Sequence, residues 1–151
     1  MRPEQRQSVV DILAAGLDIS LATLRPDGWP QATVVSYASD GLTVYFGTGA
    51  GSQKARNLAA DPRVSATVTL PYGEWSTIRG LSMAARATPV TAPEEVTHIG
   101  QLMMAKFPGM TDYVLPETAG PMALFRLDPT VVSVLDYGNG FGWTDTFEVT
   151  S

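Results

Sequence analysis

A glycine-rich turn followed by basic residues is the part of the chain best suited to bind an anion. The strand-like segment 42–48 leads through a run rich in glycine to Ser52, and a short helical segment then ends near Asp61. Ser52 is a good helix cap, because its side-chain oxygen can accept from a free backbone N–H. Lys54 and Arg56 fall in the first turns, where the positive end of the helix dipole disfavours each cation by about 0.3–1 kcal/mol. A bound anion would reverse that penalty, so the segment predicts an anion site.

The charge distribution supports such a site. The chain carries a net charge of −5 at pH 7, yet the stretch between Asp40 and Glu94 is +3 and the remainder is −8. A basic stretch within an acidic protein favours a compact anionic ligand, because a nucleic acid would require a basic surface. No nucleic-acid partner is therefore expected. The alternative is that the basic side chains are solvated residues on helix and strand edges.

Length and composition limit the other possibilities. With 151 residues and 44% hydrophobic content, the chain is expected to form a single domain over 1–151 with a sizeable core. The absence of cysteine excludes disulfides and thiolate sites, and the single histidine, His98, argues against a zinc site. No leader pattern and no run of about 18 apolar residues is found. A cytoplasmic protein without a membrane span is expected.

Hydrophobic periodicity predicts a mainly β chain with short helices. Helices are expected over 3–15, from Ser52 to Asp61, and over 93–107. Strands are expected over 18–25, 31–39, 42–48, 63–70 and 77–90, and as two runs around Asp128-Pro129 within 121–137. Turn signals such as Asp40-Gly41 join successive strands as hairpins. This organisation predicts an antiparallel barrel.

The glycine spacing does not match a dinucleotide-binding fold. The dinucleotide fingerprint places its third glycine one position later, where Ser52 stands. The preceding strands are also joined by hairpins, whereas a doubly wound fold requires crossover helices. The Gly138–Trp143 segment, which alternates glycine with aromatic residues, is expected as a loop. It would close over a ligand, or else plug the barrel or contact a second subunit.

One stretch of the sequence resembles a known protein family. It runs through the turn Pro26-Asp-Gly-Trp-Pro30, the strand Thr43-Val-Tyr-Phe-Gly-Thr48, and the segment Ser52-x-Lys54-Ala-x-Asn57-Leu-x-x-Asp61-Pro-Arg-Val-Ser65. It resembles the pyridoxamine 5′-phosphate oxidase-like, FMN-binding split-barrel proteins, with the best match over 19–70, and Ala85–Val90 looks like that family's next strand. The resemblance implies an antiparallel split β-barrel that binds FMN at the interface of a homodimer.

The resemblance also implies the residues of the cofactor site. The phosphate would meet Ser52, Gln53 and Lys54, with Thr48 beside it. The flavin ring would lie along Thr33, Val34, Val35 and Ser36, and Arg79 and Gly80 are further candidates on another strand. The implied function is an FMN-dependent oxidoreductase that passes a hydride or two electrons between the flavin and an unidentified small molecule. Catalytic side chains stay unassigned, because the flavin itself carries the chemistry.

Two departures from the family pattern leave alternatives open. Pyridoxamine phosphate oxidases proper resemble one another in an Arg and a Lys on the second strand, and 32–37 has neither. They also carry an Arg-x-His near the C-terminus, where Arg126-Leu-Asp128 lacks the histidine. Vitamin B6 oxidation is therefore not expected. The alternatives are coenzyme F420 or haem in the same groove, or a non-catalytic flavin carrier or sensor.

Overall fold

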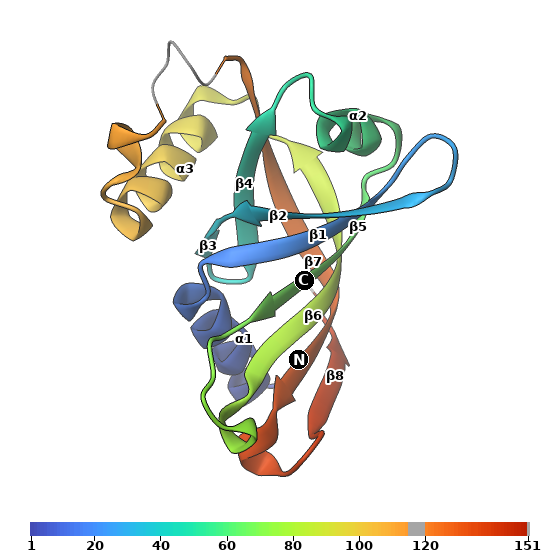
Figure 1. The fold of residues 1–151 in the computed structure, drawn as a ribbon, viewed down its shortest axis with the longest axis vertical. Coiled ribbons are helices and arrows are strands. Elements are labelled where there is room, and N and C mark those ends of the chain that lie inside the picture. The colour runs from blue at the N-terminus through green and yellow to red at the C-terminus, as the bar shows by residue number, and fades with distance from the viewer. Residues whose placement is uncertain (115–119, 151) are drawn as a thin grey trace.

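A curled antiparallel sheet dominates residues 1–114 and 120–150, which the computed structural model describes (Figure 1). Its strands are β1 (Asp18–Leu24), β2 (Pro30–Ser36), β3 (Ala38–Asp40), β4 (Thr43–Gly49), β5 (Arg63–Thr69), β6 (Arg79–Pro89), β7 (Met122–Asp136) and β8 (Thr144–Glu148). The strand order is β2-β1-β5-β6-β7-β4-β3, and β8 pairs with β7. Since β2 and β3 stand at the two ends of this order, each pairs with one strand only.

Three α-helices lie on the described part of the sheet. Helix α1 (Pro3–Ala15) contacts β3 and β6, α2 (Gln53–Ala60) contacts β1 and β4, and α3 (Pro93–Lys106) contacts β3. Short 3₁₀ turns occur at η1 (Trp75–Thr77), η2 (Met110–Asp112) and η3 (Tyr137–Asn139). In Figure 1, α2 lies near one end of the molecule, whereas η1 and η3 lie at the other. Among these described elements, no helix is long and apolar enough for a membrane crossing.

The main core fills the inside of the curl. Alternate residues point inward along β5, where Val64, Ala66 and Val68 are buried and their neighbours are exposed. Helix α1 closes this core with Ile12 and Leu13, which are fully buried. Each such aliphatic side chain contributes about 1.5–3 kcal/mol when it is buried. Helix α3 instead contributes Ile99 to a small separate cluster with Tyr45 and Val90. Leu102 and Met103 of α3 and Leu124 of β7 border this cluster.

The predicted helices and the antiparallel pairing are confirmed, with three corrections. The segment predicted as one strand over 31–39 breaks at Tyr37 into β2 and β3. The two runs predicted within 121–137 are one strand, β7, whose register against β6 shifts at Ala84/Ala85. Pro129 lies next to this irregularity, which is where a strand tolerates a residue without an N–H. Strand β8 was not predicted at all.

A buried asparagine connects α2 to the sheet. Asn57 is fully buried, and its Nδ2 donates to Thr23 Oγ1 at 3.0 Å and to Gln31 Oε1 at 3.1 Å. Its Oδ1 accepts from Gln53 Nε2 at 2.7 Å. These bonds join the second turn of α2 to both β1 and β2, and they join Gln53 in the first turn to Asn57. The start of the helix is therefore fixed against the strand that the predicted flavin ring would follow.

Replacing this asparagine should destabilise the fold. Asn57→Ala removes the shared partner of Thr23, Gln31 and Gln53, and buried polar groups without partners cost about 1–3 kcal/mol. Chemical denaturation should show a midpoint shifted accordingly. Asn139→Ala, at an exposed position, is the control and should leave the midpoint unchanged. Equal stability of the two variants would contradict this role of Asn57.

Candidate functional site

The N-terminus of α2 brings together two hydroxyl groups and free backbone donors. Ser52 caps the helix as predicted, and its Oγ accepts from the Ala55 N–H at 3.1 Å. Thr48 at the end of β4 places its Oγ1 3.1 Å from Ser52 Oγ. The N–H groups of Gln53 and Lys54, the first two helical residues, have no acceptor within the helix because none precedes them. We call Thr48, Ser52, Gln53 and Lys54 the α2 cradle.

Lys54 is the buried cation of the α2 cradle. The residue is 8% exposed, and burial lowers the pKa of its ammonium group, with no carboxylate of the described residues favouring the charged form. The dipole of α2 opposes a cation at this end as well. A buried charge without a partner is unfavourable. The described chain therefore leaves an uncompensated cation at this helix terminus.

The other basic residues around α2 have partners of their own. Arg56 is exposed and donates to Gln53 Oε1 at 2.8 Å. Arg63 pairs with Asp61 at 2.7 Å, and this guanidinium together with the Arg63 backbone N–H lowers the pKa of Asp61 to about 2. The positive charge that the sequence shows as a cluster is therefore spread over separate contacts. Among Lys54, Arg56 and Arg63, Lys54 alone is a buried residue.

Strand β2 presents the residues predicted to follow the flavin ring. Val34 is 64% exposed, whereas Val35 packs against the core. Because β2 pairs with β1 alone, its other backbone edge has no strand partner in the described residues. Gln31 at the start of this strand contacts Asn57 of α2. The predicted phosphate residues and the predicted ring residues thus lie on neighbouring elements, and their role stays a prediction.

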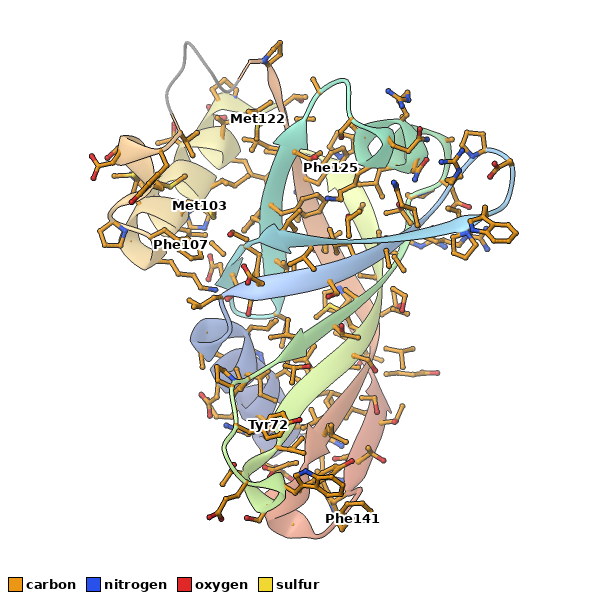
Figure 2. All side chains as sticks on the ribbon, in the orientation of Figure 1. Tyr72, Met103, Phe107, Met122, Phe125 and Phe141 are labelled. Atoms are coloured by element: carbon orange, nitrogen blue, oxygen red, sulfur yellow. The ribbon has the colours of Figure 1, made fainter. Side chains whose placement is uncertain are left out.

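A groove lies between α3 and the sheet, next to the end of β2. It has a volume of about 660 Å³ and is lined by Val35 and Ser36 of β2, Gly47 of β4 and the C-terminal part of α3. It adjoins a second hollow of about 370 Å³, and Met103 and Met122 line both. Figure 2 labels Met103 on α3, Phe107 directly after this helix, and Met122 at the start of β7. Sequence reasoning missed this groove, because its walls come from distant segments.

Arg79 and Gly80 lie away from the α2 cradle of their own chain. They begin β6 and pair with Asp136 and Leu135, at the end of the sheet opposite to α2 (Figure 1). A Cβ atom at position 80 would lie 2.5 Å from the Val68 carbonyl oxygen, so the close approach of β5 accounts for this glycine. Their predicted contact with the cofactor stays a prediction.

The Gly138–Trp143 segment lies at that same far end. Phe141 stacks on Trp75 with ring centroids 5.7 Å apart, and Tyr137 meets Phe141 edge-on at 5.3 Å. Phe141 is 79% exposed and Trp75 is 66% exposed. The segment therefore forms an aromatic tip with η1, labelled at Phe141 in Figure 2, and does not cover the α2 cradle of its own chain.

His98 is placed apart from both the α2 cradle and the groove. Its Nε2 lies 2.9 Å from a carboxylate oxygen of Asp40, and its ring meets Tyr45 edge-on at 6.0 Å. It belongs to the contact between α3 and β3. The described residues hold no cluster of three or more side chains suited to bind a metal ion.

Comparison with known proteins gives the chain a family. The family model described as pyridoxamine 5′-phosphate oxidase matches residues 8–136. No curated protein matches the chain significantly.

Several solved structures share the fold. A haem-binding protein from Mycobacterium smegmatis superposes with a TM-score of 0.79 at 22% sequence identity. The match covers 98% of this chain and 59% of that protein's chain. A conserved hypothetical protein from Mycobacterium tuberculosis gives 0.77 at 25% identity, with coverages of 100% and 93%. An F420 reductase gives 0.63 at 26% identity, with coverages of 81% and 93%. The chain thus spans a little under three fifths of the first of these proteins. The predicted split-barrel fold is confirmed, and the chain belongs to the pyridoxamine 5′-phosphate oxidase family.

Proposed function

We propose that the chain binds FMN and acts as an FMN-dependent oxidoreductase on a small molecule. The observation that carries this proposal is the largely buried residue Lys54 in the first turn of α2, the helix that Ser52 caps and whose start also holds the Thr48 hydroxyl. A phosphate monoester brings a negative charge of nearly two and several acceptor oxygens, so it matches a helix N-terminus that offers hydroxyls, free N–H groups and a lysine. Binding there would compensate the buried charge.

The flavin ring would follow the free edge of β2. Within 33–36, alternate residues direct their backbone groups to the side of β2 away from β1, and these groups are available to hydrogen-bond the polar atoms of the ring, since β2 is a terminal strand. When bound, the ring would supply two-electron chemistry: a donor molecule loses a hydride and is oxidised, and an acceptor takes up the electron pair and is reduced. The side chains of this chain would then bind and orient the cofactor. A carrier or sensor would bind FMN and show no turnover with nicotinamide cofactors and broad electron acceptors.

The phosphate contact is tested by comparing FMN with riboflavin. Lys54→Met should weaken the binding of FMN by about 10- to 100-fold, because a charge-assisted contact contributes about 1.5–3 kcal/mol. The affinity for riboflavin, which lacks the phosphate, should change by less than about twofold, as expected when the lost contact is with the phosphate. Fluorescence titration of each flavin measures both affinities.

The matched control is Arg56→Met, which removes the same charge two residues further along α2. Arg56 is exposed and bonded to Gln53, so this variant should retain most of the FMN affinity. Lys54→Met should remain folded, since the folded state no longer buries a charge. If Lys54→Met lost FMN and riboflavin equally, Lys54 would act elsewhere than at the phosphate.

A deazaflavin such as coenzyme F420 is the second candidate cofactor. Its phosphodiester carries one negative charge, and the α2 cradle has one buried cation while Arg56 turns toward Gln53. The F420 reductase found among the solved structures adds to this possibility. Titration of the purified protein with both cofactors separates them. Binding of the deazaflavin without binding of FMN would replace the first proposal.

We also propose that the chain works as a homodimer. The ring position along β2 faces solvent in a single chain, and Val34 and Trp29 near it are 64% and 73% exposed. A second copy placed on this edge would exclude water from the flavin. Because Arg79 and Gly80 lie far from the α2 cradle of their own chain, their predicted contact with the flavin also requires a second copy.

A charge on β2 should separate the dimer. Val34→Asp should give a monomer in light scattering at micromolar concentration, because an unpaired carboxylate would be buried at the interface. The same variant should bind FMN more weakly. Val131→Asp, at an exposed valine of β7, is the control and should leave the dimer intact. A monomeric wild-type protein would refute this assembly.

A further inference from the structure

The groove between α3 and the sheet contains a second buried lysine, which the proposed cofactor contacts do not use. Lys106 is the last residue of α3, and its Nζ is buried without a hydrogen-bond partner in the described part of the chain. The Nζ lies 3.7 Å from the centroid of the Tyr37 ring. The Tyr37 hydroxyl donates to the Leu13 carbonyl at 2.7 Å, so it is directed away from the lysine.

The surroundings only partly compensate this charge. Burial lowers the pKa of Lys106, whereas the negative charge of Asp18 favours the ammonium form. No ion pair joins Lys106 to Asp18 among the described residues. The ring of Tyr37 contributes a cation–π contact of about 0.5–2 kcal/mol. The Nζ atom is shielded from solvent where it lies over Tyr37, so an anion in the groove would pair with Lys106 after the flexible lysine side chain turns away from that ring.

The rest of the groove is mainly apolar. Met103, Met110, Met122, Phe107 and Val114 line it. Methionine side chains adapt to ligands of different outline because they are unbranched and polarizable. The volume of about 660 Å³ lies within the usual range of small-molecule sites, about 300–1,000 Å³. An apolar groove with one buried cation is complementary to an amphipathic anion.

We propose that this groove binds a small organic anion with a flat apolar body, whose anionic oxygens pair with Lys106. The apolar body lies against the methionines. The identification of this anion as the reaction partner of the flavin rests on the proposed function, because Val35 and Ser36 line the groove and also belong to the predicted ring site. A small neutral molecule would leave the Lys106 charge without a partner.

Two fluorescent probes that share an aromatic framework test the charge. FMN-free protein is titrated with 8-anilinonaphthalene-1-sulfonate and with N-phenyl-1-naphthylamine, which lacks the sulfonate. Lys106→Met should lower the affinity for the sulfonate probe by about tenfold or more, because the lost contact is a charge-assisted one. The affinity for the neutral probe should fall by less than about twofold. Lys106→Arg retains the charge and should retain most of the affinity. Lys106→Gln, which is neutral but polar, should behave like Lys106→Met and replaces it if that variant does not fold.

Lys54→Met is the matched control, since it removes the other buried lysine. It should lose FMN affinity and retain the sulfonate probe, whereas Lys106→Met should retain FMN. If the sulfonate probe depended on Lys54 and not on Lys106, or bound equally to all variants, the groove proposal would be overturned while the FMN proposal stood. Conversely, binding of the probe through Lys106 by a protein without FMN affinity would overturn the proposed function alone.

Discussion

The burial of Lys54 in the first turn of α2 is the constraint on which the site depends. The helix dipole and the loss of water both disfavour a cation there, and burial accordingly lowers its pKa. The fold nevertheless fixes this position through Asn57, which bonds to β1, β2 and Gln53. A bound phosphate, as proposed, would supply the negative charge that the described chain lacks at this point. The stability of this helix start and the binding of the cofactor would then be linked.

Local signals were sufficient to predict the elements around this site. Ser52 was identified as the cap of α2 because serine after a glycine-rich turn has a side-chain oxygen for the free N–H groups. The hairpin turns and alternating strands predicted antiparallel pairing, and β4 lies between the antiparallel strands β3 and β7. These features depend on residues that are close in sequence. The family likeness over the same stretch agrees with the match over residues 8–136.

Features that depend on distant segments could not be predicted in this way. Strand β8 pairs along the far half of β7, and its five residues alone show little periodicity. The groove beside Lys106 requires β2, β4 and β7 as well as α3. Likewise, the basic residues between Asp40 and Glu94 looked like one group, yet Arg63 pairs with Asp61 and Arg79 lies at the other end of β6.

The most direct test of the account is the pKa of Lys54 in the free protein and in its complex with FMN. It can be measured by NMR titration of lysine labelled with carbon-13 at the ε position, with Lys54→Met used to assign the signal. The Lys54 pKa should lie below the ordinary lysine value in the free protein and should rise when FMN binds, because the phosphate would stabilise the ammonium form. A Lys54 pKa that is the same with and without bound FMN would contradict it.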